Sequence, residues 1–413
     1  MKRSAKPPMA AAKEPTTSIR TGAWRFERPV FVSRLAPCSE ACPLGEDIPT
    51  IMALNGKGDF AGAYRKIVEE NPFPGICGRI CFHPCERVCN RGRFDEAVSV
   101  KDLEWSVFKE VQAQEPAAEG REPKKGRKVA VVGGGPAGLS CAHFLALSGH
   151  EITILERGED LEIFALSLHN GAPERADLEW EVKRILSLGV GMGSYVLHQN
   201  QGYEDLAKDF DAVYVSPKLD SDPSRKENAP VNLRSGLVVL EERGTATSGP
   251  PGKESEITRT VVRQIAAGKM AALQLDLHFR GAPSGQIRPF AVGRLGAVSF
   301  EVFKLGVTGR IPRPLQGVVR FQDINVAHFK KIPGIRPATP QETLDKPRRI
   351  ASARRCFQCG TCTFCMRCYD YCPDLAIQMN GKAKERAIDY DHCKGCGICA
   401  EECPRGAISW VHE

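Results

Sequence analysis

Residues 362–373 read CTFCMRCYDYCP, and residues 393–404 repeat the same spacing as CKGCGICAEECP. Each stretch has three cysteines separated by two residues, then a fourth cysteine after three residues, followed by proline. Three thiolates at this spacing can ligate one [4Fe–4S] cluster, while the fourth cysteine of the run ligates the neighbouring cluster. The repeat therefore predicts two crossed clusters, one held by Cys362, Cys365, Cys368 and Cys403 and the other by Cys393, Cys396, Cys399 and Cys372.

A zinc site is the alternative for cysteines this close together. Zinc takes four ligands in a closed tetrahedron, and two sets of four cysteines that each end in Cys-Pro match it poorly. Cys356 and Cys359 precede the first run, but only the register that starts at Cys362 has the three-residue gap before Cys-Pro. We expect Cys356 and Cys359 to be packed as small residues; a place beside a cluster, or ligation of a partner's cluster, are the alternatives.

The distribution of the 17 cysteines in 413 residues also favours cluster sites. Six lie between Cys38 and Cys89, ten between Cys356 and Cys403, and only Cys141 lies in the middle. No apolar run reaches the roughly 18 residues of a membrane span, and no signal peptide is evident, so we expect a cytoplasmic protein without a membrane partner. Clumped cysteines in a reducing compartment are typical of metal or cluster sites. The net charge of +7 is scattered, and we expect no nucleic-acid partner.

Composition and hydrophobic periodicity predict an α+β protein of several domains. The predicted segments are a basic solvated tail (1–30), a helical cysteine-bearing domain (31–113), a linker (114–127), a Rossmann-like α/β domain (128–280), a connecting segment (281–355) and a ferredoxin-type domain (356–413).

A glycine turn opens the α/β segment. Gly133, Gly135 and Gly138 follow the predicted strand 128–132 and begin the predicted helix 137–147. Such a turn lets a dinucleotide's pyrophosphate approach the helix N-terminus, and an acidic residue after the next strand binds the ribose. The acidic residue at that place is Glu156.

The N-terminal cysteines follow no standard ferredoxin spacing, but six thiols supply one full cluster and part of another. They are Cys38, Cys42, Cys77, Cys81, Cys85 and Cys89. Residues 31–110 resemble the N-terminal iron–sulfur domain of the glutamate synthase small subunit and dihydropyrimidine dehydrogenase. The resemblance implies one or two [4Fe–4S] clusters, with Glu104 as a non-cysteine ligand. Cysteines that the family carries ahead of Cys38 are absent, so a single cluster with two buried thiols is the alternative.

In that family the glycine turn binds FAD, so the resemblance implies FAD here too. Two departures change the expected function. The family inserts an NAD(P)H domain between the strands that correspond to 212–215 and 237–240, and only some twenty residues lie there. Residues 161–171 and 216–218 lack the family's flavin-binding pattern. We therefore expect a Rossmann-like centre without an NAD(P)H domain, holding FAD or, as the alternative, nothing.

The C-terminal runs look like the ferredoxin-type delta subunit of 2-oxoacid:acceptor oxidoreductases, and Ile19–Pro29 looks like the arm of such subunits. This resemblance implies an electron-transfer subunit with thiamine-diphosphate-binding partner subunits, for instance in an NAD-linked phenylglyoxylate dehydrogenase. No set of side chains in the sequence suggests a catalytic residue. The alternatives are a stand-alone NAD(P)H:ferredoxin-type flavoprotein reductase and a structural scaffold with an empty Rossmann pocket.

Overall fold

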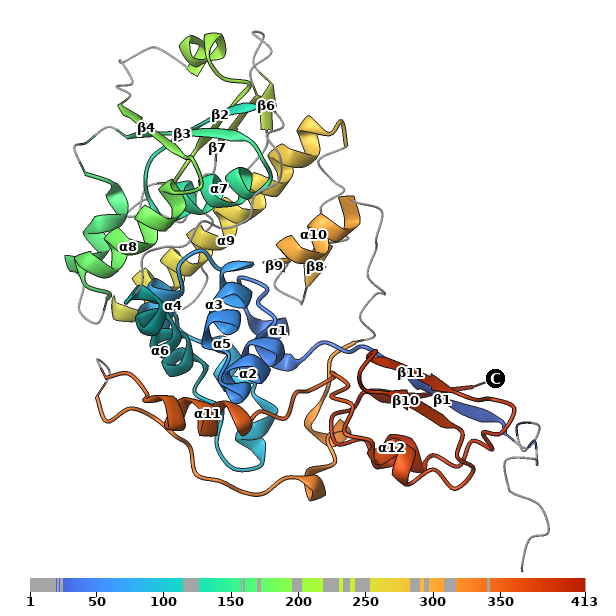
Figure 1. Cartoon of the computed structure of the whole chain (residues 1–413). Helices are drawn as coiled ribbons and strands as arrows, with labels where there is room; N and C mark the ends of the chain where they lie inside the picture. Colours follow the sequence, from blue (N-terminus) through green and yellow to red (C-terminus); the bar gives the residue numbers. More distant parts are fainter. Residues whose placement is uncertain are drawn as a thin grey trace, which may run out of the picture. The chain divides into compact units, whose positions relative to one another are not determined.

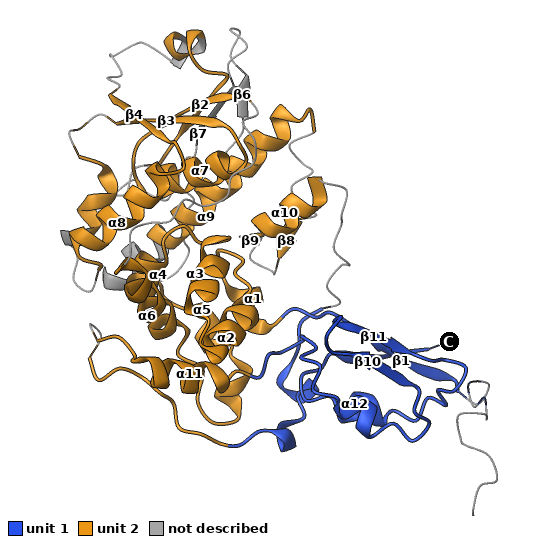
Figure 2. Cartoon of the chain, in the orientation of Figure 1, with its two compact units in different colours: residues 1–35, 314–330, 357–413 blue, residues 36–313, 331–356 orange. Residues whose placement is uncertain are grey.

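The chain forms two compact units in the computed structural model (Figure 2). Unit 1 comprises residues 1–35, 314–330 and 357–413, and unit 2 comprises residues 36–313 and 331–356. The structure describes residues 20, 22, 25–113, 126–156, 158, 160–168, 172–194, 203–217, 230–232, 238–241, 253–282, 290–292, 297–307, 317–339 and 342–412.

Unit 2 begins with a group of short helices (Figure 1). They are α1 (Pro37–Ala41), α2 (Ile48–Lys57), α3 (Phe60–Val68), α4 (Pro74–Ile80), α5 (Pro84–Arg87), the 3₁₀ helix η3 (Asn90–Arg93) and α6 (Val100–Gln112). Aspartates start two of them: Asp47 accepts from Thr50 N at 3.3 Å, and Asp59 accepts from Gly62 N at 2.8 Å. These caps satisfy N–H groups that have no partner inside a helix.

A six-stranded sheet follows, with α7 and α9 packed together beside it (Figure 1). The strand order is β4 (Gly191–Ser194), β3 (Glu151–Glu156), β2 (Lys128–Val132), β5 (Ala212–Val215), β7 (Val238–Glu241) and β6 (Pro230–Asn232). All neighbours are parallel except β6 and β7. The helices are α7 (Pro136–Leu147), α8 (Arg175–Leu186) and α9 (Lys253–Phe279). Parallel strands with crossover helices are the Rossmann-like arrangement that the glycine turn predicts.

The remaining parts of unit 2 also have regular structure. They are the 3₁₀ helices η4 (Glu162–Leu168) and η5 (Tyr203–Lys208), the short strands β8 (Ala291–Val292) and β9 (Ala297–Val298), α10 (Phe300–Val307) and α11 (Lys346–Arg354). Helix α11 packs against α2 and α6, so the chain returns to the first helices after the sheet.

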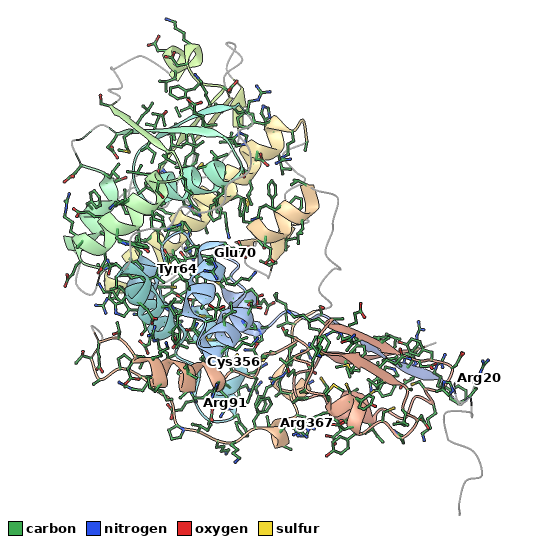
Figure 3. The ribbon with its side chains drawn as sticks, viewed as in Figure 1. Arg20, Tyr64, Glu70, Arg91, Cys356 and Arg367 are labelled. Carbon is green, nitrogen blue, oxygen red and sulfur yellow. The ribbon has the colours of Figure 1, made fainter. Side chains whose placement is uncertain are left out.

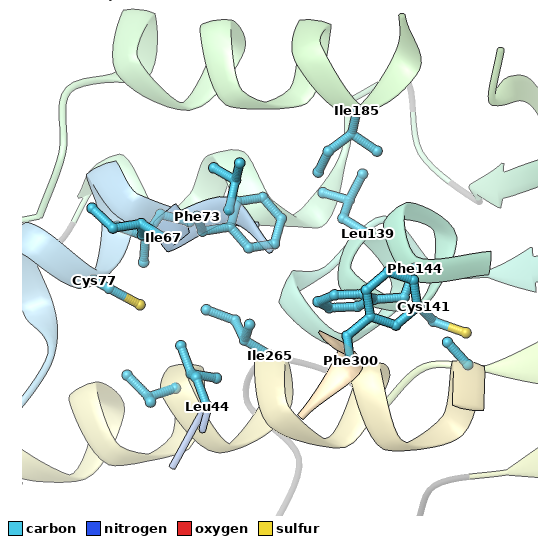
Figure 4. Close-up of a cluster of buried hydrophobic side chains, with 14 of the residues drawn as sticks. Leu44, Ile67, Phe73, Cys77, Leu139, Cys141, Phe144, Ile185, Ile265 and Phe300 are labelled. Carbon is cyan, nitrogen blue, oxygen red and sulfur yellow. The ribbon is translucent and has the colours of Figure 1, made fainter. Parts of the chain in front are cut away.

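One hydrophobic core runs through unit 2 (Figure 4). It joins Phe73 from the first helices, Leu139 and Phe144 from α7, Ile265 from α9 and Phe300 from α10. The segments expected as separate domains at 31–113 and 128–280 therefore share a core, and the connecting segment contributes α10 and α11 to the same unit.

Unit 1 combines both ends of the described chain. Strand β1 (Glu27–Phe31) pairs antiparallel with β12 (Ile408–His412), and β10 (Ile377–Asn380) pairs with β11 (Glu385–Ile388). The unit also holds the 3₁₀ helices η7 (Phe321–Asp323) and η8 (Val326–His328) and the single-turn helices α12 (Arg367–Asp370) and α13 (Ile398–Glu401).

The sequence predicts a solvated tail over 1–30, but residues 27–30 belong to a strand of unit 1. Tyr390 Oη donates to Pro29 O at 2.9 Å, and the guanidinium groups of Arg25 and Arg28 lie 5.2 and 5.0 Å from the centre of the Tyr390 ring. The basic residues that suggested a solvated arm therefore contact an aromatic ring, and the arm is part of unit 1. Residues 1–19 lie outside the described part. No helix in the described ranges is long and apolar enough to span a membrane.

Candidate iron–sulfur centres

The two cysteine runs of unit 1 have the same backbone path. Three residues within or just after the first run have left-handed φ angles. In each case the residue 31 positions later has one too. The pairs are Phe364 (φ 54°) with Gly395 (72°), Met366 (67°) with Gly397 (87°), and Leu375 (50°) with Gly406 (65°). The first run adopts with ordinary side chains a conformation that favours glycine. Its loops are thus held in the conformation of the second run at some cost in strain.

The first group of thiols lies around one pocket. The cysteines that line this pocket are Cys362, Cys365, Cys368 and Cys403. Phe31, Met379 and Ile408 also line it. Burial raises the pKa of Cys368 to about 12, and the nearby thiolates of Cys362, Cys403 and Cys365 add to the rise. The structure therefore brings together the four cysteines predicted for the first crossed cluster.

The second group gathers around Cys399. Burial raises the pKa of this thiol to about 12, and the charges of Cys393, Cys368, Cys372 and Cys396 add to the rise. Cys393 likewise has Cys372 and Cys396 as neighbours. The fourth cysteine of each run therefore lies with the first three of the other, and Cys368 and Cys399 place the two groups side by side.

Backbone amides donate to the fourth thiol of each run. Ala376 N lies 3.3 Å from Cys372 Sγ, and Ala407 N lies 3.3 Å from Cys403 Sγ. Hydrogen bonds to the ligating sulfurs are one of the means by which a protein sets a cluster's reduction potential. Both halves of the repeat therefore have a backbone amide that donates to the fourth thiol.

The N-terminal group lies inside the core of unit 2. Burial raises the pKa of Cys85, and the charges of Cys42, Glu104, Cys81 and Cys38 add to the rise, which places these groups beside Cys85. Burial also raises the pKa of Glu104 to about 8. Glu46, hydrogen-bonded to Glu104, has its pKa raised by burial and by the charge of that neighbour. The side chains of Cys42, Cys81, Cys85 and Glu104, three thiols and a carboxyl, thus form one set of buried or half-buried neighbours.

His83 holds part of this group in place. Its backbone is left-handed (φ 40°), and its N–H donates to Cys81 Sγ at 3.4 Å. Its Nε2 lies 3.5 Å from a carboxylate oxygen of Glu104. His83 therefore contacts two members of the set.

The other predicted N-terminal ligands are Cys77, Cys38 and Cys89, and the charges of Cys81 and Glu104 also act on Cys77. The Cys77 thiol donates to Asn71 Oδ1 at 3.6 Å, on the buried face of α4. Cys38 lies near Cys85, and Cys89 starts the turn that leads into η3. Within the described ranges, no three His, Cys, Asp or Glu side chains are arranged around a single metal ion.

The glycine turn has the backbone that a dinucleotide site needs, but its open face is filled. Gly133 has φ 103°, and a Cβ on Gly138 would collide with Gly133 O. Glu156, predicted to bind a ribose, instead accepts from Gly134 N at 2.6 Å. Glu162 Oε2 lies 2.7 Å from where a Cβ of Gly135 would be. Two carboxylates therefore lie beside the start of α7, one of them on the amide of Gly134.

Three domain profiles match separate segments of the chain. The profile described as dihydropyrimidine dehydrogenase domain II, 4Fe-4S cluster, matches residues 31–116. The 4Fe-4S binding domain matches 386–409, and the NAD(P)-binding Rossmann-like domain matches 131–170. The chain carries two iron–sulfur domains and a Rossmann-like domain. These matches confirm the predicted α+β class and the [4Fe–4S] cofactors at both ends. A Rossmann-like domain of this kind is compatible with FAD.

Curated relatives resemble part of the chain. NADPH-Fe(3+) oxidoreductase subunit beta of Geobacter sulfurreducens is 35% identical over 188 residues, which are 44% of this chain and 28% of that protein. NADP(+)-dependent formate dehydrogenase subunit beta of Moorella thermoacetica is 30% identical over 214 residues, 45% of this chain and 29% of that protein. The glutamate synthase [NADPH] small chain of Bacillus subtilis is 31% identical over 184 residues, 43% of this chain and 36% of that protein. The chain spans less than two fifths of each of these relatives.

Proposed function

We propose that the chain is an electron-transfer subunit of a cytoplasmic multi-subunit oxidoreductase. The observation that carries the proposal is the crossed arrangement in unit 1, where Cys368 of one group of thiols neighbours Cys399 of the other. Crossed thiolate sets of this kind hold two [4Fe–4S] clusters, which accept and release one electron at a time. The names of relatives that are oxidoreductase subunits support the same role.

The residues of the chain act as ligands and as the surroundings of the clusters. The eight cysteines of the two runs would hold the C-terminal pair, and Cys42, Cys81, Cys85 and Glu104 would hold an N-terminal cluster. Ala376 N and Ala407 N would donate to ligating sulfurs, and Phe31 and Ile408 would keep water from the first of the C-terminal groups. No side chain in this proposal touches a substrate.

The host enzyme proposed is a 2-oxoacid:acceptor oxidoreductase of the NAD-linked phenylglyoxylate type. Strand β1 supports this host. It belongs to the arm that resembles that of delta subunits, and it pairs with the last strand of the ferredoxin-type unit. Expression together with the products of neighbouring genes should yield a complex that contains thiamine-diphosphate-binding subunits. Isolation only with unrelated partners would contradict this host.

Metal and flavin analysis of the full chain, purified without oxygen, tests the electron-transfer role itself. We expect at least about twelve irons and as many sulfides, from two C-terminal clusters and one N-terminal cluster. Protein that oxidises NADPH by itself would favour the stand-alone reductase instead. Iron–sulfur clusters that no reductant can reduce would favour the structural scaffold.

A further inference from the structure

The arm ahead of β1 contacts the loop that leads into the second cysteine run. Figure 3 shows Arg20, the first described residue, near the end of β1. Gly22 N donates to Asp391 O at 2.9 Å, just before the second run begins. The residue 31 positions earlier, just before the first run, is Gly360, and its carbonyl accepts from Arg34 N at 3.5 Å. Segments on either side of β1 therefore hold the two halves of the repeat at equivalent points.

Arg25 brings a positive charge to the second run. Its Nη1 donates to Tyr390 O and to Cys393 O, the latter at 3.4 Å, and its guanidinium lies 5.2 Å from the centre of the Tyr390 ring. Burial raises the pKa of the Cys393 thiol, and the charge of Arg25 acts in the opposite direction. A cation that favours a thiolate also favours an added electron on a cluster held by that thiolate, because both are negative charges.

Gly395 makes room for the arm on this loop. A Cβ at this position would collide with Glu27 O and would lie 2.9 Å from Arg25 Cβ. The equivalent residue of the first run is Phe364, which has the same left-handed backbone conformation. The two loops thus share a backbone path but not a neighbour, since the second has a glycine where the arm packs and the first has a large side chain.

The first run has a cation from within the repeat. Arg405 Nε donates to Thr363 Oγ1 at 2.8 Å, and both residues line the pocket of the first group of thiols. The corresponding residues, 31 positions away, are Asp374 and Lys394, and they form an ion pair with an N–O distance of 3.4 Å. The charges of an ion pair largely cancel at a distance. These two positions thus give the first group a positive charge and the second none, and Arg25 supplies one from outside the repeat.

We propose that Arg25 raises the reduction potential of the second C-terminal cluster, which makes the arm a part of the electron path. The ligands of this cluster are the second group of thiols, Cys372, Cys393, Cys396 and Cys399. This role rests on the electron-transfer function proposed above. The cluster accepts one electron from a donor and passes it to the next carrier, and the guanidinium stabilises the reduced form, which is more negative by one charge. Arg25 is a positioning residue, because it acts through the carbonyl groups of the loop.

The test is a redox titration of the full chain, purified without oxygen, reduced stepwise with dithionite and followed by electron paramagnetic resonance. In Arg25→Gln the ratio of reduced to oxidised second cluster at a fixed potential should fall about tenfold, a shift of about 59 mV for one electron. The other signals should be unchanged. The shift should persist in Cys368→Ala/Arg25→Gln relative to Cys368→Ala, which lacks the first C-terminal cluster. Titration curves that coincide for Arg25→Gln and the wild type would overturn the proposal.

Three matched variants separate charge from packing. Arg25→Lys keeps the cation and should retain most of the wild-type potential. Arg28→Gln removes another cation that lies on the Tyr390 ring and should change the ratio by less than about twofold. Arg405→Gln should lower the potential of the first C-terminal cluster and leave the second unchanged. An equal shift in Arg25→Lys or Arg28→Gln, or a shift of the same signal in Arg405→Gln, would contradict the role of Arg25.

Iron content decides the matter if Arg25→Gln does not retain its clusters. In that case Arg25→Lys should keep the roughly four irons that Arg25→Gln loses, because the cation remains. Equal loss in both variants would show that the charge is not what matters. Wild-type protein without reducible clusters would remove the electron-transfer function itself, whereas reducible clusters that do not respond to Arg25→Gln would remove only the role of the arm.

Discussion

The N-terminal and C-terminal cysteine groups offer thiolates in contrasting surroundings. In unit 2, Cys42 and Cys85 are buried in a helical core beside the carboxyl groups of Glu46 and Glu104. In unit 1 the loops are short and partly open, and Cys365 and Cys396 are exposed. Burial and nearby negative charge both disfavour adding an electron. The comparison teaches that cysteine spacing selects the chemistry, whereas the packing around it decides how easily each cluster is reduced.

The largest expected effect is on the C-terminal side of this comparison. Cys368→Ala should remove about four irons per chain, because three thiolates remain at a site that needs four. Iron analysis together with electron paramagnetic resonance of the reduced protein measures the loss. The signals of the N-terminal region should persist, and Cys141→Ala is the matched control. Retention of all the iron would show that Cys368 is not a ligand.

Glu104 tests the N-terminal side. Glu104→Ala should lose about four irons from the N-terminal region, while Glu104→Cys should retain them, because a thiolate replaces the carboxylate as ligand. The C-terminal signals should be unchanged in both variants. A cluster that survives Glu104→Ala with an unaltered potential would remove the carboxyl from the ligand set and make the two groups alike.

The packing that supports the N-terminal group depends on one buried ion pair. Lys269 of α9 donates to Leu44 O and to Glu70 Oε2, the latter at 2.8 Å. Glu70 also accepts from Ser299 Oγ and from Phe300 N. Lys269→Met should lower the free energy of unfolding of unit 2 by about 3–5 kcal/mol, because Glu70 keeps a buried charge without its cation.

Denaturant unfolding followed by circular dichroism measures this change. Lys269→Met/Glu70→Leu should recover part of the loss, since the buried charge is then absent. Arg175→Ala, which breaks an exposed ion pair with Asp160, should have no measurable effect. Equal stability of Lys269→Met and the wild type would show that the pair does not support the group.

The smallest expected effect concerns the arm that supports the C-terminal group. Tyr390→Phe removes the hydrogen bond to Pro29 O and should cost about 1 kcal/mol. The readout is the rate at which a chelator removes iron from the C-terminal clusters, which should rise several-fold, with no change at the N-terminal cluster. An unchanged rate would mean that the arm contributes little to cluster retention.

The regular elements were largely predictable from local patterns. The β-branched run Lys128–Val132 and the glycine turn after it correctly predict β2 and the start of α7. The crossed grouping of Cys403 with Cys362 follows from a repeat that is visible in the sequence. Such features depend on neighbours close along the chain, and periodicity reports them.

Other features depend on contacts between distant segments. Strand β1 has only five residues and contains Pro29, and its partner lies about 380 residues away, so no local pattern marks it. The placement of Glu162 against the glycine turn depends on the path of η4, which the residue types do not determine. His83 follows Cys81 by two residues in the sequence, which suggests a hydrogen-bond donor near the cysteines, but its contact with Glu104 depends on the fold.

The pairing of β1 with β12 also sets an order of events during synthesis. The first helices, which carry Cys42, Cys81, Cys85 and Glu104, are complete roughly 300 residues before β12 is made. At about 5–20 residues per second, that interval is roughly 15–60 seconds. During it β1 has no partner strand, and an unpaired strand is prone to pair wrongly. The ferredoxin-type unit can therefore be completed only when the end of the chain has been made, and β1 needs protection until then.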